Sequence, residues 1–514
     1  MVLSPALGFF HASATRRRAR EILRTVFHLP GFRPGQEEVV SAALGGRDVI
    51  ALFPTGAGKS LCYQLPALML SGPTLVVSPL IALMRDQVSH LEQLGIPALC
   101  LDSLQDSAAQ QDSLARIRQG WPRLIYVSPE RLQSTAFQRA MLACPPSAVV
   151  VDEAHCVAQW GDSFRPAYAE IGSFLQNLPV RPVVLAMTAT ADGRMRAQIA
   201  ASLRMRHPKT VTLPILRPNL RYALCTTLNT TAWIQDYVRA HAGAKGLVFC
   251  ATRKRCEALA ARLAALTGED SALIRAAYYH AGLEREERLR IQEAFQAGEY
   301  DVLAVTSAFG MGVDIPDVRY TVHDSLPRSM LDLAQQTGRA GRDGQRSECV
   351  LLLSPPQLEW RRHQLSRQRF EAKKDHQERL RLWKDWQEER RVLEALLSGR
   401  CIASEISGCF GRREASCGVC SACARRASSG WLAGKSPVAP VPDLYHMDDI
   451  ALRRWALTWE RKALAHSLGV PQSRVLDADS LLRSARMGRL AGDPPLPQAK
   501  ASLERLLGAM RTAR

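Results

Sequence analysis

The sequence predicts an α/β protein with two tandem parallel-sheet domains, followed by a helical cysteine-rich module and a small helical C-terminal region. From about residue 20 to about residue 205, short apolar runs alternate with helical patterns, which is typical of a parallel sheet covered by helices. A second series of the same kind starts after residues 217–222 (RPNLRY). Beyond about residue 360 the apolar residues take helical spacing.

Length and charge limit the class of protein. The chain has 514 residues, of which 46% are apolar, and this is enough for two to four domains with large cores. The formal net charge of +18 favours a polyanion or an anionic membrane as partner. The sequence contains no run of 18 apolar residues, so we expect no membrane-spanning helix.

The N-terminus and the cysteines indicate the cellular compartment of the protein. The apolar residues 2–10 precede the arginines within 16–20, which is the reverse of the order in a secretory signal. Most of the 13 cysteines occur singly within apolar stretches, as is typical of a reducing compartment. We therefore expect a cytoplasmic, nucleoid-associated protein without a membrane partner.

The two parallel-sheet domains are expected over residues 21–208 and 209–356, after an N-terminal extension of residues 1–20. Strand signals of the first domain are apolar runs bounded by Gly, Pro, Ser or Asp, at 48–52, 74–78, 124–128, 148–152 and 183–188. Strand signals of the second domain lie at 247–250, 301–305, 320–323 and 349–353.

The first strand leads into a phosphate-binding pattern, PTGAGKS (54–60). Here Gly56 and Gly58 let backbone N–H groups approach phosphate oxygens, Lys59 reaches the terminal phosphates, and the Ser60 hydroxyl is suited to Mg²⁺. The remaining loop residues are Thr55 and Ala57. The strict pattern has glycine where this chain has Phe53, but the strand–loop–helix context predicts a nucleotide site rather than a chance glycine loop.

Two further charged groups complete a predicted hydrolysis site. Asp152 follows an apolar strand and can hold Mg²⁺, and the adjacent Glu153 can orient or activate the attacking water. Far along the chain, Arg339 and Arg342 are three residues apart and can neutralise charge on a transferring phosphoryl group from across a domain boundary. The alternative for the arginines is a basic, glycine-rich surface turn.

These motifs, in this order, resemble superfamily-two helicases of the DEAH-box type and, among them, the RecQ family of DNA helicases. The likeness covers about residues 20 to 423 and rests on 32–36 (FRPGQ), 54–64 (PTGAGKSLCYQ), 78–88 (SPLIALMRDQV), 126–132 (YVSPERL), 152–168 (DEAHCVAQWGDSFRPAY), 187–191 (MTATA), 217–222 (RPNLRY), 279–283 (YHAGL), 308–319 (AFGMGVDIPDVR) and 335–344 (QQTGRAGRDG). The resemblance implies two RecA-like domains that bind ATP between them and translocate 3′ to 5′ on single-stranded DNA.

The resemblance also assigns residues to the base of ATP. In the family the glutamine of FRPGQ reads the adenine edge, which implies this role for Gln36, with Arg33 close by. The family often has a stacking aromatic residue just upstream, whereas this chain has residues 27–29 (FHL) there. Leu29 is then the candidate to cover the base, with a weaker preference for ATP over other nucleotides.

An aromatic-rich loop follows the DEAH motif in this family and contacts DNA. The residues of this chain that fall on it are Trp160, Phe164, Arg165 and Tyr168. Bases stack on aromatic faces with about 1–3 kcal/mol each, and arginine adds phosphate or cation–π contact. The alternative is that Trp160 and Phe164 belong to the core, but the polar residues between them favour the DNA loop.

Other residues are expected to couple hydrolysis to DNA or to contact its backbone. The resemblance implies coupling roles for His155, Thr188, Thr190 and Gln335. Arg85 and Ser128 are weaker candidates for phosphate contacts. Two segments near ATP or DNA depart from the family pattern, namely 314–316 (DIP in place of NKP) and 333–336 (LAQQ in place of YYQE), so the details of coupling stay open.

A helical module over residues 357–426 is expected to hold a metal. Its cysteines form the spacing C-x₁₅-C-x₂-C-x₂-C at Cys401, Cys417, Cys420 and Cys423. The close x₂ spacing lets thiolates converge on a tetrahedral ion, and the upstream cysteine closes a structural Zn²⁺ site. The alternatives are a redox cluster or unpaired thiols. Cys409 lies between and is expected to be a bystander.

A linker (427–446) and a helical region (447–514) follow this module. The linker is too short for the strand-separating winged-helix domain of many RecQ proteins, so we expect a short form without that domain. The C-terminal region faintly resembles the helicase-and-RNase-D C-terminal domain, a small helical DNA-binding module, in a degenerate form. A generic helical cap is the alternative.

Together these features predict an ATP-dependent DNA helicase of RecQ type that acts in DNA recombination and repair with ATP, Mg²⁺ and Zn²⁺. The expected partners are single-stranded DNA, tailed or forked duplexes, and a single-stranded-DNA-binding protein. The alternatives are a DNA-stimulated translocase that unwinds poorly and a zinc-bearing DNA-binding protein with a degenerate motor. The sequence leaves the oligomeric state and the preferred DNA structure open.

Overall fold

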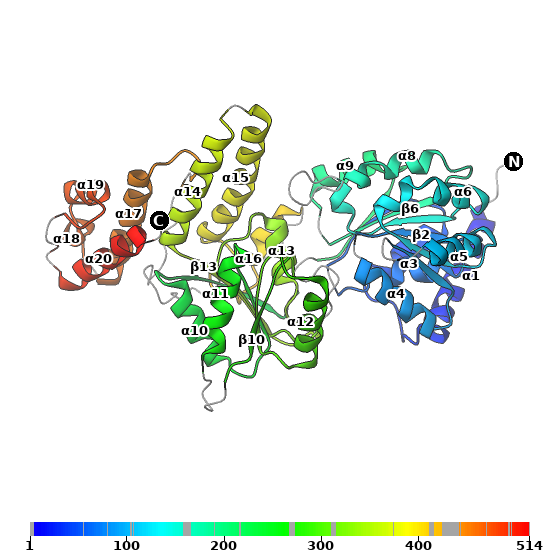
Figure 1. The fold of residues 1–514 in the computed structure, drawn as a ribbon, viewed down its shortest axis with the longest axis horizontal. Coiled ribbons are helices and arrows are strands. Elements are labelled where there is room, and N and C mark those ends of the chain that lie inside the picture. Colours follow the sequence, from blue (N-terminus) through cyan, green and yellow to red (C-terminus); the bar gives the residue numbers. More distant parts are fainter. Residues whose placement is uncertain are drawn as a thin grey trace. The chain divides into compact units, whose positions relative to one another are not determined.

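The computed structural model describes residues 5–512 apart from 55, 80, 103–104, 106, 158–165, 190, 215–216, 267–272, 310–314, 374, 411–415, 424–441, 443, 469, 492–493 and 495. The chain divides into two compact units, Met1–Ile215 and Leu216–Arg514 (Figure 1). Each unit contains one parallel sheet.

The sheet of the first unit has seven strands in the order β3-β4-β2-β5-β6-β1-β7. The strands are β1 (Val49–Leu52), β2 (Thr74–Val77), β3 (Ala98–Leu101), β4 (Leu124–Val127), β5 (Ala148–Val151), β6 (Val183–Thr188) and β7 (Lys209–Thr212). Successive residues of a strand point to opposite faces, so Ile50 and Leu52 pack into one core and Val49 and Ala51 into another. Both faces of this sheet are therefore covered.

Helices cover this sheet and are joined to it by short connections. They are α1 (Pro5–Thr25), α2 (Gln36–Leu44), α3 (Leu61–Ala67), α4 (Ile81–Gln93), α5 (Ser107–Arg118), α6 (Thr135–Ala143), α7 (Pro166–Ala169), α8 (Ile171–Gln176) and α9 (Gly193–Ser202), with 3₁₀ turns η1 (Pro129–Gln133) and η2 (Ala154–Val157). Helix α1 continues the expected N-terminal extension into the domain, because its buried Ala19 and Leu23 pack with Leu61 and Leu65 of α3.

The expected boundary between the domains, after residue 208, is wrong. Strand β7 pairs with β1 along its full length, with Val49 opposite Lys209 and Leu52 opposite Thr212. Residues 209–215 therefore belong to the first unit. The short KTVT run of β7 carries little apolar signal, so only its pairing with β1 reveals it as a strand.

The sheet of the second unit has six strands in the order β10-β11-β9-β12-β13-β8. They are β8 (Leu220–Thr226), β9 (Gly246–Phe249), β10 (Ala276–Tyr279), β11 (Val302–Val305), β12 (Tyr320–His323) and β13 (Ser347–Leu353), with helices α10 (Thr230–Ala240), α11 (Arg253–Ala264), α12 (Arg285–Ala297) and α13 (Met330–Thr337). The two parallel-sheet domains and the helices that cover them confirm the predicted α/β class.

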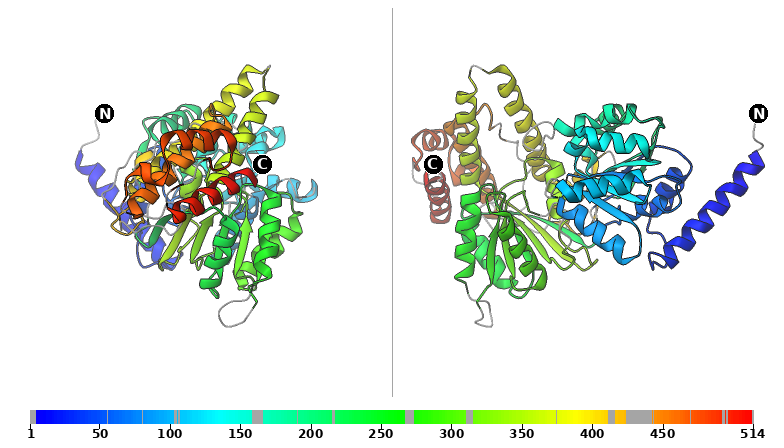
Figure 2. Two further views of the ribbon diagram at one scale, coloured as in Figure 1. Left: turned by 90° about the vertical axis from the view of Figure 1, so that its left-hand side faces the viewer. Right: turned by 45° about the vertical axis from the view of Figure 1, so that its right-hand side comes forward.

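The regular secondary structure of the described residues after this sheet consists of helices. They are α14 (Pro355–Glu371), α15 (His376–Leu397), α16 (Ile402–Cys409), α17 (Asp449–Leu468), α18 (Gln472–Val475), α19 (Ala478–Met487) and α20 (Pro497–Thr512). Helices α14 and α15 run antiparallel next to each other (Figure 2). In the part of the chain that the structure describes, no helix is long and apolar enough to span a membrane.

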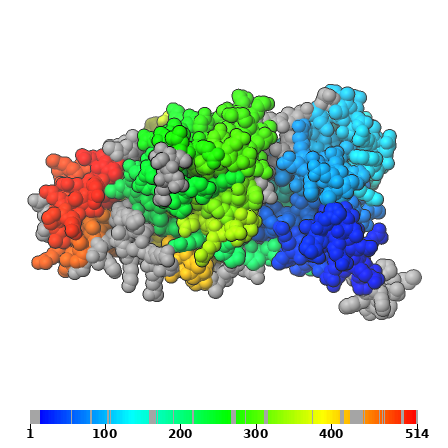
Figure 3. Space-filling model, turned by 90° about the horizontal axis from the view of Figure 1, so that it is seen from below, coloured from blue at the N-terminus to red at the C-terminus, as the bar shows by residue number. Residues whose placement is uncertain are grey.

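The C-terminal helices share one hydrophobic core with α14 and α15. This core joins Leu358 and Leu365 of α14 and Trp386 of α15 to Trp459 of α17 and Leu507 of α20, all buried. In the space-filling view the C-terminal helices adjoin the sheet domain of the same unit (Figure 3). The region is therefore packed into the second unit rather than tethered to it.

Candidate nucleotide site and cysteine cluster

The predicted hydrolysis residues of the first unit meet at one edge of its sheet. Strands β5, β6 and β1 are neighbours, and all are parallel. Their carboxyl ends therefore place Asp152 after β5, Thr188 at the end of β6 and the 54–60 loop after β1 side by side. Crevices at the carboxyl ends of parallel strands are the usual ligand sites of such sheets.

The FRPGQ segment (32–36) holds the phosphate-binding loop by hydrogen bonds to its carbonyl groups. Gly56 and Gly58 have positive φ angles of 82° and 76°. The Gln36 amide donates to the carbonyls of Gly58 (3.0 Å) and Ala57 (3.3 Å), and its oxygen accepts from the Arg33 N–H at 2.8 Å. Gln36 is 2% exposed, so reading an adenine edge would require this amide to leave the loop.

Arg33 makes a second contact with the same loop, and Phe53 anchors its start. The Arg33 guanidinium donates to the Gly56 carbonyl at 3.0 Å. Phe53, which stands where the strict pattern has glycine, is fully buried and its N–H donates to the Thr188 carbonyl at 2.9 Å. The residue that departs from the pattern is thus a core residue directly after β1. Thr55 lies outside the described residues.

Asp152 is a buried carboxyl group next to Lys59. It is 8% exposed, and its N–H donates to the Val77 carbonyl at 2.9 Å, which fixes it at the end of β5. Burial first and the charge of Glu153 second raise the pKa of Asp152 to about 6, while the positive charge of Lys59 acts in the opposite direction. A cation placed here would favour the ionised carboxylate.

Glu153 and His155 form a contact chain that reaches β6. The backbone of Glu153 has a φ angle of 48°, a left-handed conformation that a side chain this long rarely adopts. His155 Nδ1 lies 3.2 Å from Glu153 Oε2 and 3.0 Å from Thr188 Oγ1. Glu153 is therefore linked through a buried histidine to the end of the neighbouring strand, while Thr190 lies outside the described residues.

The assignment of Tyr168 to a DNA-stacking surface is corrected by the structure. Tyr168 lies on α7, is 1% exposed and packs in the core of the first unit. Its hydroxyl donates to the Asp152 carbonyl at 3.2 Å. A ring buried in this way has no free face for a base, so the residue supports Asp152 instead. Trp160, Phe164 and Arg165 lie outside the described residues.

The two weaker candidates for phosphate contacts lie on other elements. Arg85 of α4 makes a bidentate ion pair with Asp102, which is 1% exposed, at 2.7 and 3.2 Å. This pairing offsets the charge that a phosphate would meet. Ser128 is half-buried after β4, where its carbonyl accepts from the Arg131 N–H. Phosphate contact by either residue stays a prediction.

In the second unit, Arg339 and Arg342 lie just after α13, and both are half-buried. Gln335 lies on α13 and is half-buried, whereas Leu333, which replaces an aromatic residue of the family pattern, is fully buried. The backbone around the arginines is held by Arg217 and Asn219. The sequence signal for these two residues is the motif RPNLRY (217–222), which by itself predicts no role for either side chain.

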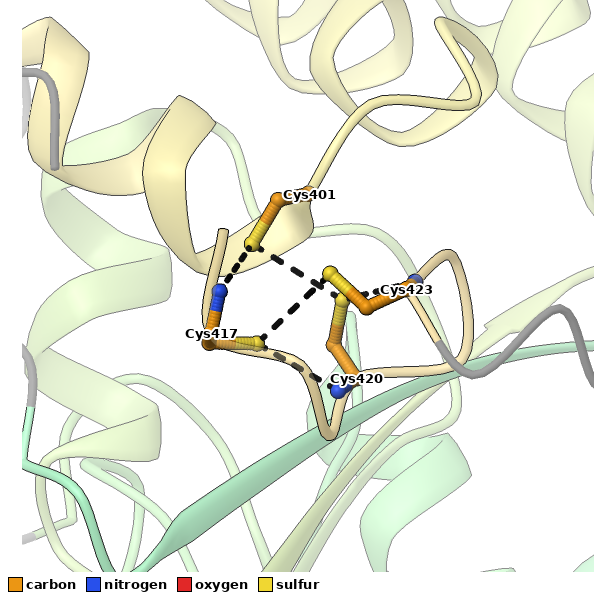
Figure 4. Close-up of side chains that lie close together, drawn as sticks. All are labelled: Cys401, Cys417, Cys420 and Cys423. Carbon is orange, nitrogen blue, oxygen red and sulfur yellow. Dashed lines mark hydrogen bonds between the residues drawn. The ribbon is translucent and has the colours of Figure 1, made fainter. Parts of the chain in front are cut away.

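The four cysteines of the predicted metal site converge (Figure 4). The Sγ atoms lie 3.9 Å apart for Cys401 and Cys420 and 4.0 Å apart for Cys417 and Cys423, and all four lie within 4.8 Å of one another. Four sulfurs around a tetrahedral Zn²⁺, each about 2.3 Å from the ion, would be about 3.8 Å apart. The arrangement therefore fits this ion.

Backbone groups support thiolate sulfurs in this cluster. The N–H groups of Cys417, Cys420 and Ser404 point at sulfur atoms over 3.3–3.5 Å, and Cys401 itself caps the start of α16. Such donors stabilise the charged ligand. Cys409 is exposed and outside the cluster, as expected of a bystander.

The cysteine loop also covers a free edge of the second sheet. The N–H of Ser421 donates to the Tyr222 carbonyl at 2.9 Å, and the Ser421 hydroxyl accepts from the Leu224 N–H at 3.0 Å. Both partners belong to β8, the edge strand. An unpaired edge is prone to unwanted strand addition, so the loop protects the sheet.

A second group of possible metal ligands does not fit a cation. Glu359, His363 and Asp449 place ligand atoms within 4.8 Å of one another, and Glu359 is fully buried. However, Arg453 lies 3.5 Å from Glu359, and Arg362 pairs with Asp449. Two guanidinium groups already balance the two carboxylates, so the group is a buried charge network between α14 and α17.

Comparisons with known proteins give two family matches and several close relatives. Residues 33–199 match the DEAD/DEAH box helicase family, and residues 229–344 match the helicase conserved C-terminal domain. The chain is 36% identical over 408 residues to the ATP-dependent DNA helicase RecQ of Bacillus subtilis, which covers 79% of this chain and 67% of that protein. It is 38% identical over 345 residues to the probable ATP-dependent DNA helicase RecS of the same organism, covering 66% of this chain and 68% of that protein.

The match to another relative is closer but covers less of that protein. The chain is 40% identical over 351 residues to the ATP-dependent DNA helicase RecQ of Pasteurella multocida, which covers 68% of this chain. The matched part spans about half of that relative, or 54% of its length.

Solved helicase structures share the fold. The helicase Lhr of Mycobacterium smegmatis, bound to single-stranded DNA and AMP-PNP, has a TM-score of 0.53 at 19% identity and covers 86% of this chain and 61% of its own. The helicase MrfA bound to DNA has a TM-score of 0.57 at 20% identity and covers 68% of this chain and 52% of its own. At these identities the likeness concerns the fold alone.

Proposed function

Because the chain belongs to the RecQ family of helicases, we propose that it is an ATP-dependent DNA helicase that acts in recombination and repair. The observation that carries the proposal is the meeting of the 54–60 loop, Lys59 and the buried Asp152 at one sheet edge. This arrangement supports nucleotide hydrolysis, and the family supports DNA as the partner.

Each residue of the first unit has a distinct role in this proposal. Lys59 binds the terminal phosphates, and the backbone N–H groups of the loop complete the phosphate cradle. Mg²⁺ held by Ser60 and Asp152 would neutralise phosphate charge. Glu153 orients and deprotonates the attacking water, and its contact with His155 fixes the carboxylate direction.

The second unit supplies positive charge for the transferring phosphoryl group. We assign this role to Arg339 and Arg342, because guanidinium groups stabilise the charge that develops on phosphoryl oxygens. Gln335 and the pair His155 and Thr188 would couple hydrolysis to DNA contact. Since Thr188 contacts His155 at 3.0 Å and His155 contacts Glu153 at 3.2 Å, a shift at the end of β6 would reach Glu153 through His155.

The DNA partners in this proposal are single-stranded DNA and tailed or forked duplexes, with 3′ to 5′ translocation. Trp160, Phe164 and Arg165 would contact the strand, and the net charge of +18 favours the polyanion. The cysteine cluster would hold Zn²⁺ as a structural ion that fastens its loop to β8. DNA as substrate would place the protein in the cytoplasm at the nucleoid, where a single-stranded-DNA-binding protein is a candidate partner.

The test measures ATP hydrolysis with and without single-stranded DNA and the unwinding of a 3′-tailed duplex, for the wild type and Lys59→Ala. We expect DNA to stimulate hydrolysis, the duplex to unwind, and both activities to be lost in the variant. Stimulation without unwinding would identify a translocase. Hydrolysis that ignores DNA would contradict the proposal.

A further inference from the structure

One guanidinium group in the second unit holds three carbonyl groups of a loop that is distant in the sequence. Arg217 donates from Nη2 to the carbonyls of Gly338 and Ala340, both at 2.6 Å, and from Nη1 to the carbonyl of Gly341 at 3.0 Å. The amide of Asn219 donates to the Gly341 carbonyl at 2.8 Å. We call Arg217 and Asn219 the carbonyl clamp.

The clamp occupies the end of helix α13, where carbonyl groups have no partners within the helix. Helix α13 ends at Thr337, and its C-cap residue is Gly338. The last carbonyls of a helix carry partial negative charge, so a buried cation is a favourable partner for them. The half-buried Arg217 meets this need at the Gly338 carbonyl, and the same planar group also reaches the Ala340 and Gly341 carbonyls of the loop that follows the helix.

The loop is shaped so that only glycine fits under the clamp. Gly341 has a φ angle of 58°, which favours glycine. A Cβ atom there would lie 2.5 Å from the Asn219 amide nitrogen and 2.7 Å from the Ser347 hydroxyl. The Asn219 amide also donates to the Gln345 carbonyl at 2.8 Å, which closes the loop on itself.

The clamped carbonyls belong to the peptide bonds that precede the two candidate arginines. The Gly338 carbonyl shares a planar peptide group with the N–H of Arg339, and the Gly341 carbonyl shares one with the N–H of Arg342. Fixing these carbonyls therefore fixes the direction in which both arginine side chains leave the backbone. Burial and, after it, the positive charge of Arg342 lower the pKa of Arg217.

We infer that Arg217 and Asn219 are positioning residues that hold the Arg339–Arg342 loop ready for phosphoryl transfer. The inference rests on the proposed function and adds residues to which we assigned no role from the sequence. Arg217 is also the first described residue after the division between the units at residue 215.

The first test compares Arg217→Lys with the wild type in single-stranded-DNA-stimulated ATP hydrolysis. A lysine keeps the charge but cannot span three carbonyls. Small misplacements of catalytic groups cost rate rather than binding, so kcat should fall roughly 10- to 100-fold while KM for ATP changes by less than about twofold. The matched control is Arg221→Lys, which alters the same motif at a residue that pairs with Glu348 on the strand and should keep wild-type kcat.

A double-variant cycle separates positioning from a general loss of structure. If Arg217 acts through Arg339 and Arg342, then adding Arg217→Lys to a chain that already carries Arg339→Ala and Arg342→Ala should lower kcat by no more than about twofold. Multiplicative losses, an unchanged kcat in Arg217→Lys, or a loss confined to KM would each overturn the inference. If Arg217→Lys fails to fold, Asn219→Ala tests the same clamp and should lower kcat several-fold at unchanged KM.

The outcomes distinguish this inference from the proposed function. A wild type that hydrolyses ATP under DNA stimulation, combined with a fully active Arg217→Lys, would overturn the clamp alone. A wild type without any DNA-stimulated hydrolysis would overturn both.

Discussion

At the scale of single residues, the end of β5 concentrates strain and buried charge. Glu153 adopts a φ angle of 48°, and its neighbour Asp152 is 8% exposed with a pKa raised to about 6 by burial. Tyr168 secures this corner from the core by donating to the Asp152 carbonyl. A strained backbone conformation and a buried carboxyl group are both unfavourable, so the surrounding structure must stabilise them. Such features are typical of functional sites.

The role of Glu153 gives a prediction at this scale. Glu153→Gln keeps the size and the backbone conformation of the residue but removes the base, so kcat for ATP hydrolysis should fall about 10²-fold or more while ATP binding is retained. Steady-state hydrolysis and equilibrium binding of a fluorescent ATP analogue measure the two effects. Glu92→Gln, at an exposed position on α4, is the matched control, and wild-type kcat in Glu153→Gln would refute the assignment.

At the scale of elements, the edge strands differ from the central ones. The central β2, β4 and β5 are buried along their whole length, whereas the edge strands β3 and β7 contain partly exposed residues. Edge strands need protection, and the cysteine loop supplies it for β8, because Ser421 donates one hydrogen bond to that strand and accepts another from it. The metal cluster is therefore expected to stabilise the second sheet as well as its own loop.

Removal of one cysteine tests this expectation. Cys420→Ser should lose bound zinc, measured by atomic absorption, and should lower both the solubility and the melting temperature of the protein, because its fully buried sulfur is one of four ligands. Cys409→Ser changes an exposed cysteine outside the cluster and should keep the metal. Full zinc content with unchanged melting in Cys420→Ser would refute a structural zinc site.

A buried carboxyl group gives the C-terminal helices a pH dependence. Glu460 of α17 is 1% exposed and accepts a hydrogen bond from Ser502 of α20. Burial raises the pKa of Glu460 from 4.5 to about 7. The folded state therefore holds a proton that the unfolded state releases, and the free energy of unfolding should fall as the pH rises from about 4.5 to 7, by roughly 3 kcal/mol at most.

The matched variant for this effect is Glu460→Gln, which keeps the hydrogen-bonding shape without the charge. Its melting temperature should vary less between pH 5 and 8 than that of the wild type, and should exceed the wild-type value at pH 8. Parallel pH profiles of the two proteins in thermal denaturation would rule out this role of Glu460.

At the scale of the whole molecule, the C-terminal helices complete the second unit. Their buried Trp459 and Leu507 pack in the same core as Trp386 of α15, and a buried charge network joins Glu359 of α14 to Arg453 of α17. Arg369 of α14 adds a cation–π contact at 4.3 Å to Tyr445. Such a shared core is expected of a structural part of the unit rather than an independent module.

Truncation after residue 423 tests this view. Removing the C-terminal helices would expose the apolar sides of α14 and α15 and leave Glu359 without its arginine partner, so the shortened chain should aggregate and melt several degrees lower. Light scattering and calorimetry measure the two effects. A shortened chain as soluble and as stable as the full one would indicate an independent C-terminal domain.

The sequence by itself determined the features that depend on neighbouring residues. The periodicity of apolar residues, the turn residues and the spacing within motifs predicted the two parallel-sheet domains, the 54–60 loop, the DEAH strand end and the cysteine cluster. Each of these features depends on residues within a short segment of the chain. The strands that it missed, β3, β7, β8 and β10, are the edges of the two sheets. Strands β7 and β8 mix polar and apolar residues, so their local pattern is weak.

Only the tertiary structure decided which distant residues meet. The strand order places Asp152 and the 54–60 loop at one edge of the sheet, and packing buries Tyr168 in the core. Arg217 donates to carbonyl groups up to 124 residues away in the sequence. Such contacts arise when separate elements bury their apolar faces together. Their energy therefore depends on the packed whole, and no short stretch of sequence encodes it.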